Sequence, residues 1–398
     1  MASNQKVSLT TATALVIANM VGTGVFTSIG FQAADIPDAN AILIVWILGA
    51  IVALCGGICY SKVAELYPGY GGEYHFLTKA WNPTLGLIGG IVSIISGFAA
   101  PVALAALAFG AYFSIFFKTA NGNITAIAII SIITIFHLFS IKTSSKFQLV
   151  TTTFKIVLIL LFIIVGFWAK DSGNNFNNDL PSIDLFFTEG FSRSLVYVAF
   201  AFSGWNASVY IFNELKKPGT DIKLSILAGT LIVGSLYLLL NYVFLKVVAL
   251  KKLQGVLEAS ELAASQLFGK SGGEIISIII CVLLLSTISA MVWVGPRVIE
   301  RMGNDVRLLK WFDHKDEERI PYRAILLQYA ITIIILFSGT FNFILVNTGI
   351  LLNLSTMLTV AILFKHPLSL DKKTYFAAIL FLLVTSSSTF YLLLKVLI

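Results

Sequence analysis

The chain has 398 residues, of which 57% are hydrophobic and only 12% are charged, and its mean hydropathy is +0.90. Soluble domains carry about 25% charged residues, so this composition excludes an ordinary soluble protein and indicates an all-α polytopic membrane protein. The net charge of +7 does not indicate a nucleic-acid partner, because the basic residues are spread between apolar runs. In such positions they determine how the chain is oriented in the lipid bilayer.

The apolar runs predict eleven membrane spans, since about 20 apolar residues are needed for one crossing. The predicted spans are residues 7–33, 40–66, 83–117, 124–141, 148–169, 190–214, 223–250, 272–302, 322–338, 341–364 and 375–397. The apolar stretch 322–364 is too long for one crossing, and Ser338-Gly339-Thr340 is the natural turn inside it. No separate soluble domain is predicted, so residues 1–398 are expected to form one membrane domain.

The distribution of Lys and Arg predicts the orientation. Most of the 27 Lys and Arg residues lie on the same side of the predicted spans as the N-terminus. Cytoplasmic loops carry an excess of Lys and Arg, so the N-terminus is predicted to be cytoplasmic. An odd number of spans then puts the C-terminus outside the cell membrane.

The first span contains a sequence that does not suit a continuous helix. Gly22 and Gly24 flank Thr23 in its middle. A helix that breaks at mid-depth leaves backbone N–H and C=O groups that hydrocarbon cannot satisfy, so it must face protein or a watery cavity. The freed amides at the start of the second half-helix favour an anion. The alternative is close packing of helices through small residues.

The sixth span has a matching interruption, with Ser203 and Gly204 at mid-depth. Both interrupted spans begin a possible five-span unit, one at about 7–169 and the other at about 190–364, followed by an extra span at 375–397. Interruptions at corresponding positions of two halves point to a transporter binding site between inverted repeats. The predicted fold is therefore a 5+5 inverted-repeat transporter with broken spans one and six.

Four motifs, in the expected order, resemble those of the amino acid–polyamine–organocation transporters, in particular the L-amino acid transporter branch. They are MVGTGVF at 20–26, AELYPGYGGEY at 64–74, FSGWN at 202–206 with ELKKP at 214–218, and GPRV at 295–298 with Met302. Members of this superfamily usually have twelve spans, whereas this sequence gives eleven. The resemblance implies a ten-span core, with the last span outside it.

The resemblance also implies an amino acid bound at the two breaks. Amides of Thr23, Gly24 and Val25 would bind its carboxylate, and carbonyls at both breaks would accept from its ammonium. Phe200 falls where the family has an aromatic gate, although a ring facing lipid or core is the alternative. The implied substrate-binding residues are Asn19, Met20, Gly22, Thr23, Gly24, Val25, Phe200, Ala201, Phe202 and Ser203. A side chain at Gly24 is expected to block the carboxylate without preventing folding.

Lys155 lies about seven residues inside the fifth predicted span, or about 10 Å deep at 1.5 Å per residue. Ionisable residues at such depth are usually functional. The alternative is that Lys155 extends to the cytoplasmic surface beside Lys142 and Lys146. The position resembles a span-five lysine of sodium-independent members, whose ammonium stands where sodium sits in sodium-coupled relatives. The resemblance therefore implies a coupling role.

Other reactive residues indicate neither a catalytic nor a metal site. Cys55, Cys59 and Cys281 lie in apolar runs and are expected to be buried, unreactive thiols, and the four histidines are isolated. No cofactor is expected. Glu65 and Glu73 lie at the inward end of span two beside Lys62 and Lys79. We expect a solvated structural network there rather than the acid pair of a membrane enzyme.

The outward loop at 118–123 contains no cysteine. Eukaryotic members of the branch often join a single-span glycoprotein through a cysteine in this loop, so no disulfide-linked heavy subunit is expected.

The predicted function is sodium-independent transport of L-amino acids by alternating access, either as an exchanger or as a proton-linked symporter. Neutral substrates are favoured, because the interrupted segments carry no charged side chain and a buried charge would need a partner. The alternative is an amino acid sensor that uses a transporter fold without net flux.

Overall fold

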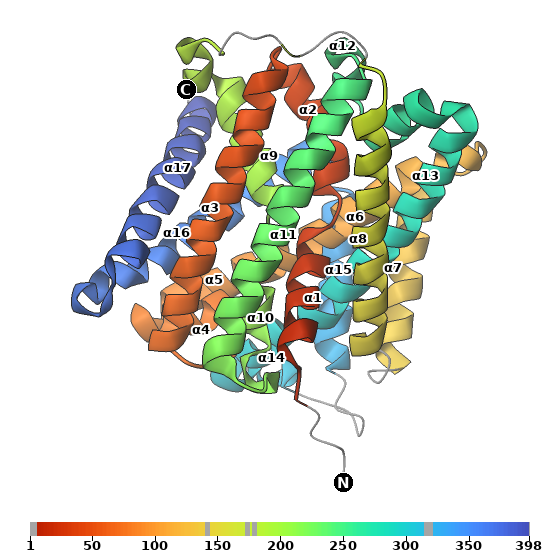
Figure 1. Cartoon of the computed structure of the whole chain (residues 1–398). Helices are drawn as coiled ribbons and strands as arrows, with labels where there is room; N and C mark the ends of the chain where they lie inside the picture. Colours follow the sequence, from red (N-terminus) through yellow and green to blue (C-terminus); the bar gives the residue numbers. More distant parts are fainter. Residues whose placement is uncertain (1–5, 140–143, 172–175, 177–180, 314–320, 398) are drawn as a thin grey trace.

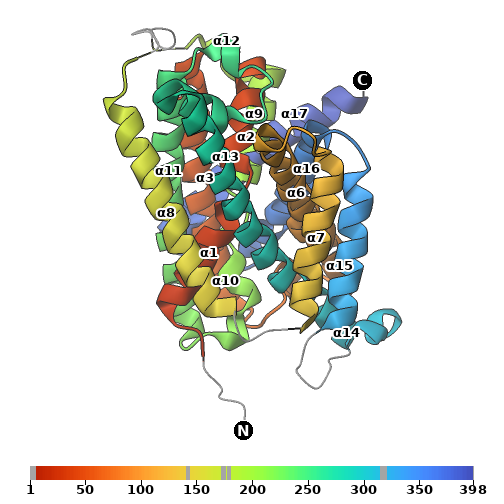
Figure 2. The same cartoon turned by 90° about the vertical axis from the view of Figure 1, so that its right-hand side faces the viewer.

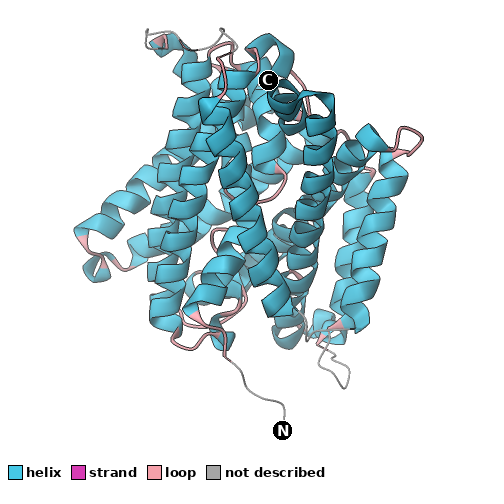
Figure 3. Cartoon of the chain, turned by 45° about the vertical axis from the view of Figure 1, so that its right-hand side comes forward, coloured by secondary structure: helices cyan, strands magenta, loops and turns pink. Residues whose placement is uncertain are grey.

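The computed structural model describes residues 6–139, 144–171, 176, 181–313 and 321–397. Within these ranges the chain is helical, with short loops and no strand (Figure 3). One isolated β-bridge joins Val7, just before the first helix, to Leu215. The amide of Val7 donates to the Glu214 carbonyl at 2.7 Å, which ties the start of the first span to the end of the sixth.

The helices follow one another along the chain as two sets. The first half contains α1 Leu9–Met20, α2 Gly24–Asp35, α3 Ala39–Leu66, α4 Gly72–Ala80, α5 Pro83–Val92, the π-helix η1 Ser93–Ala99, α6 Ala100–Phe116, α7 Gly122–Phe139 and α8 Ser144–Trp168. The second half contains η2 Ile183–Phe187, α9 Glu189–Ala201, α10 Ala207–Tyr210, η3 Phe212–Glu214, α11 Pro218–Val247, α12 Leu250–Leu253, α13 Ala259–Val294, α14 Pro296–Asp305, η4 Arg307–Phe312, α15 Tyr322–Leu336, α16 Phe341–Ala361, η5 Ile362–Lys365, η6 Pro367–Ser369 and α17 Lys372–Leu397.

Each of the eleven predicted spans coincides, over its described residues, with a helix or with consecutive helices. Seven of these helical segments are long and apolar enough to cross a membrane. The fourth, fifth and ninth predicted spans correspond to shorter apolar helices at 122–138, 152–168 and 322–336, and the sixth is divided between α9 and α10. Large apolar side chains such as Ile132, Phe136, Leu161 and Ile164 are exposed on α7 and α8, as expected for surfaces that face lipid.

The predicted turn inside 322–364 is confirmed. Helix α15 ends at Leu336 and α16 begins at Phe341. The Thr340 hydroxyl caps α16 by accepting from the amide of Phe343 at 3.3 Å. Residues of this kind at a helix start supply an acceptor for an amide that has no partner within the helix.

The two interrupted spans lie side by side and run in opposite directions (Figures 1 and 2). Helix α2 packs against α9, and α1 packs against α10. In Figure 1, α2 and α9 lie in the upper half of the bundle and α1 and α10 in the lower half. The start of α1 and the end of α17 lie at opposite ends of the bundle. The antiparallel arrangement brings the two breaks to the same depth.

Candidate functional site

The first break spans Val21 to Thr23, between α1 and α2. The amide of Gly22 donates to the Met20 carbonyl at 2.8 Å, which forms a tight turn. Thr23, Gly24 and Val25 occupy the cap and the first two positions of α2, where backbone amides have no partner within the helix. These three amides therefore form the positive end of a half-helix inside the bundle.

The second break spans Phe202 to Asn206, between α9 and α10. Gly204 has φ of +95°, a left-handed conformation that favours glycine. A Cβ at Gly204 would lie 2.9 Å from the carbonyl carbon of Asn19. The two breaks are thus in direct contact, and glycine is required for that contact.

Tyr237 on α11 connects the two breaks. Its hydroxyl lies 2.6 Å from the Met20 carbonyl oxygen and 3.3 Å from the Ala201 carbonyl oxygen, and donates toward both. Tyr237 is not among the binding residues predicted from the sequence. A useful signal was present, because a tyrosine inside an apolar helix requires a polar partner for its hydroxyl when buried.

Lys155 on α8 reaches the first break. Its side chain is fully buried, and Nζ donates to the Val21 carbonyl at 3.1 Å and to Thr287 Oγ1 at 2.7 Å. Thr287 Oγ1, on α13, also lies 3.2 Å from the Val21 carbonyl. The ammonium therefore holds α8, α13 and the break together and does not extend to the surface. Side chains at Lys142 and Lys146, its expected neighbours at the surface, lie outside the described residues.

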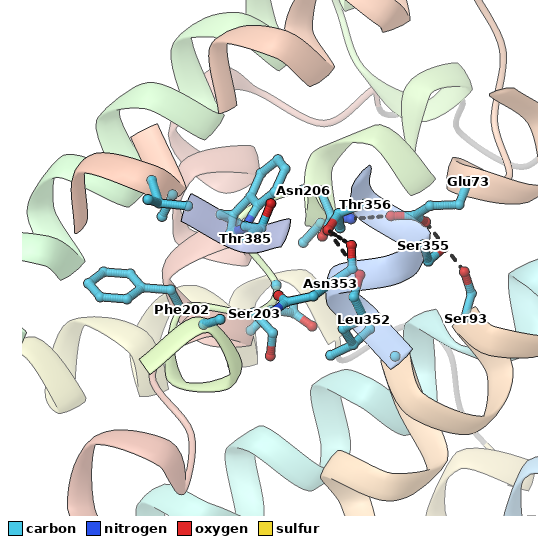
Figure 4. Close-up of a pocket in the computed structure, with 18 of the residues that line it drawn as sticks. Glu73, Ser93, Phe202, Ser203, Asn206, Leu352, Asn353, Ser355, Thr356 and Thr385 are labelled. Carbon is cyan, nitrogen blue, oxygen red and sulfur yellow. Dashed lines mark hydrogen bonds between the residues drawn. The ribbon is translucent and has the colours of Figure 1, made fainter. Parts of the chain in front are cut away.

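A cavity of about 90 Å³ lies beside the second break (Figure 4). Of the predicted binding residues, Asn19, Phe202 and Ser203 line it. Its remaining wall comes from α3, α4, η1, α9, α10, α13, α16 and α17 and from the second break itself. These residues are Gly49, Val52, Ala53, Glu73, Ser93, Gly97, Phe98, Leu195, Ala199, Gly204, Trp205, Asn206, Ala207, Tyr210, Met291, Val294, Leu352, Asn353, Ser355, Thr356, Phe381, Val384, Thr385 and Ser388.

The other predicted binding residues are not part of the wall of this cavity. These are Met20, Gly22, Thr23, Gly24, Val25, Phe200 and Ala201. Gly24 packs closely against α9, since a Cβ there would lie 2.5 Å from Cα of Ala201. The expectation that a side chain at Gly24 leaves folding intact is therefore wrong, because it would push two helix backbones apart. Close helix packing, the alternative for this motif, operates at Gly24.

Phe200 is buried in a small apolar cluster between α6, α9 and α16. The cluster contains Ala100, Leu104, Tyr197, Phe200, Ile344 and Leu345. Towards the C-terminal end of α2, Arg193 donates to Asp35 Oδ1 at 2.8 Å, which joins α9 to α2. The apolar cluster thus joins α9 to α6 and α16, and the ion pair joins it to α2.

The prediction for Glu65 and Glu73 is half correct. Glu65 is exposed and pairs with Lys62 at 3.0 Å. Glu73, in contrast, is buried and lines the cavity, because the loop after α3 turns back and α4 carries Glu73 under the second break. Three glycines with positive φ, at 69, 71 and 72, make this reversal. The sequence position of Glu73 beside basic residues gave no indication of this.

The last predicted span, 375–397, also contributes to the cavity. Helix α17 packs against α3, α9 and α16 and contributes Phe381, Val384, Thr385 and Ser388 to the cavity wall. It therefore belongs to the helices that form the cavity rather than lying outside them.

The cysteines are buried and free, as predicted for Cys55, Cys59 and Cys281. Groups of His, Cys, Asp or Glu that would suit a metal ion do not occur among the described residues.

The chain is similar to known amino acid transporters. The model of the family described as amino acid permease matches residues 7–396. The chain is 27% identical to the serine/threonine exchanger SteT of Bacillus subtilis (strain 168), over 83% of this chain and 76% of that protein. It is 24% identical to the mouse b(0,+)-type amino acid transporter 1, over 85% and 71%. It is 26% identical to the inner membrane transport protein YbaT of Escherichia coli (strain K12), over 77% and 71%.

Proposed function

This chain belongs to the amino acid permease family, and from this premise we propose that it carries L-amino acids across the cell membrane by alternating access. It is a multi-pass membrane transporter rather than an enzyme. The observation that carries the proposal is the contact between two broken spans beside a cavity. Unpaired amides at Thr23, Gly24 and Val25 would bind the substrate carboxylate, and Asn19, Phe202 and Ser203 would contact the rest of it.

The ammonium of the substrate requires acceptors, and backbone carbonyls at the breaks would supply them. The carbonyls of Met20 and Ala201 already interact with Tyr237. A carbonyl oxygen has two lone pairs, so Tyr237 would orient these carbonyls and still leave one lone pair on each to accept from the substrate ammonium. We assign the carbonyls of Asn19, Phe200 and Ser203 the same role in substrate binding.

Lys155 supports sodium-independent transport. A fixed ammonium bound to the Val21 carbonyl occupies the space between α8 and the first break. A sodium ion at this place would be repelled by the charge and excluded by the volume of the side chain. We propose that Lys155 replaces a coupling ion.

Alternating access requires that the substrate site open to each side in turn. The cluster around Phe200 and the pair of Arg193 with Asp35 support a conformation closed at one end. We infer that two inverted repeats, about 7–169 and 190–364, move relative to each other around the two breaks. From the distribution of Lys and Arg along the sequence we infer that the closed end faces outward.

Neutral L-amino acids are the proposed substrates, and the similarity to a serine/threonine exchanger and to an amino acid transporter supports transport or exchange of amino acids. The experiment is uptake of labelled serine and leucine into proteoliposomes, with and without amino acid inside. Uptake that requires internal amino acid identifies an exchanger, and uptake driven by a pH gradient identifies a proton symporter. Replacement of sodium by choline is expected to leave uptake unchanged.

A sensor with a transporter fold is the competing function. Binding of the amino acids, measured by a thermal shift, without flux in either liposome experiment would favour the sensor and contradict transport.

No disulfide-linked heavy subunit is proposed. The turn between α6 and α7 contains no cysteine, and the thiols of the chain are buried. Activity of the purified chain alone in liposomes is the corresponding test.

A further inference from the structure

Glu73 is held at the cavity wall by four donors from separate parts of the chain. Tyr60 on α3 donates to Oε1 at 2.9 Å, and Asn206 of the second break donates to the same oxygen at 2.7 Å. Tyr210 on α10 donates to Oε2, and Ser93 on η1 lies 3.4 Å from Oε2. Figure 4 shows Glu73 between Ser93 and Asn206 at one end of the cavity.

This arrangement fits a carboxylate rather than a carboxylic acid. An ionised carboxylate accepts about four hydrogen bonds, and here two donors lie at each oxygen. The Asn206 amide nitrogen can only donate, and the three hydroxyls can all donate at the same time only to an ionised carboxylate.

The charge of Glu73 is not neutralised by a cation in the part of the chain that the structure describes. The side chain is 4% exposed, and the ion pairs among the described residues do not include it. Every other side chain in the cavity wall is apolar, a hydroxyl or an amide. The wall therefore carries one fixed charge, and that charge is negative.

We propose that Glu73 determines substrate charge by excluding amino acids with anionic side chains from the cavity. This inference rests on the proposed function and specifies its substrate class. A second carboxylate in the cavity would lose its water and face the Glu73 charge in a medium of low dielectric constant. A neutral side chain avoids this repulsion. Since the lone pairs of Glu73 are occupied by protein donors, the carboxylate offers little to a substrate side chain by direct hydrogen bonding.

The test compares amino acids of similar shape that differ in charge. Glutamine and glutamate, and asparagine and aspartate, compete at pH 7 against uptake of labelled serine into proteoliposomes. In the wild-type protein the anionic member of each pair is expected to compete at least about tenfold more weakly. That factor corresponds to the repulsion energy between two unit charges about 10 Å apart at an effective dielectric constant of about 20. In Glu73→Gln the ratio of the two inhibition constants, anionic member over neutral member, is expected to fall toward one.

Glu65→Gln is the matched control, because Glu65 is exposed at the same end of α3 and lies outside the cavity wall. It is expected to keep the wild-type ratio. Glu73→Asp keeps the charge and is expected to keep the discrimination even if overall uptake falls. This variant also serves if Glu73→Gln fails to fold, since loss of discrimination in Glu73→Asp would contradict the proposal.

Three results overturn the inference. These are equal competition by both members of the pairs in the wild-type protein, an unchanged ratio in folded Glu73→Gln, and lost discrimination in folded Glu73→Asp. If serine is transported but one of these results is found, only the role of Glu73 is wrong. If no amino acid binds or is transported, the proposed function fails and the inference fails with it.

Discussion

At the scale of single residues, Lys155 is the residue whose placement bears most directly on coupling. We expect Lys155→Ala to reduce uptake about tenfold or more, because hydrogen bonds to a charged group contribute about 1.5–3 kcal/mol. The variant loses both bonds of Nζ and leaves a cavity between α8 and the first break. The measurement is serine uptake into proteoliposomes in choline buffer.

Lys155→Arg is expected to restore little activity, since a planar guanidinium does not fit a place shaped for an ammonium. Lys118→Ala, at an exposed position, is the matched control and should transport normally. Normal uptake by Lys155→Ala without sodium would show that the coupling role is wrong.

Tyr237 gives a second prediction at this scale. Tyr237→Phe removes one hydroxyl that bridges the Met20 and Ala201 carbonyls and adds no bulk. Loss of a hydrogen bond of about 1 kcal/mol is expected to weaken substrate affinity about fivefold. Affinity is measured by titrated thermal shift. Tyr375→Phe, at an exposed ring of α17, should keep the wild-type affinity, and equal affinity of both variants would exclude Tyr237 from the site.

At the scale of helices, the contact of α2 with α9 depends on Gly24. We expect Gly24→Ala to destabilise the folded protein by about 1–3 kcal/mol, because its Cβ would meet the Ala201 backbone at 2.5 Å. The thermal unfolding midpoint in detergent should fall, together with uptake.

The matched control for Gly24→Ala is Gly219→Ala at the start of α11, where a Cβ meets nothing within 4 Å. Its midpoint should equal or exceed that of the wild type. A Gly24→Ala protein as stable as Gly219→Ala would mean that the two half-helices separate more easily than the structure indicates.

At the scale of the whole molecule, the start of α1 and the end of α17 lie at opposite ends of the bundle. We predict that Lys6→Cys is labelled by a membrane-impermeant thiol reagent only from the cytoplasm and Lys395→Cys only from outside. The native cysteines are buried, so background labelling should be low. Labelling of both positions from one side would show that the predicted orientation is wrong for one end of the chain.

The sequence by itself determined the order of the helical segments, the turn at Ser338-Gly339-Thr340 and the two breaks. These features depend on local chemistry, because length, apolarity and helix-breaking glycines act within a few residues. The family motifs are local in the same sense, and the match over residues 7–396 confirms the resemblance that they predicted.

Only the tertiary structure decided which residues surround the cavity. Glu73 looked like a surface residue beside lysines, yet three glycines reverse the chain and bring it beneath the second break. Tyr237 and α17 became part of the site because helices distant in sequence pack there. Gly24 allows α2 to pack closely against α9, in addition to lying at the break in the first span. Such contacts depend on how helices are arranged around each other, and hydropathy along one chain does not encode that arrangement.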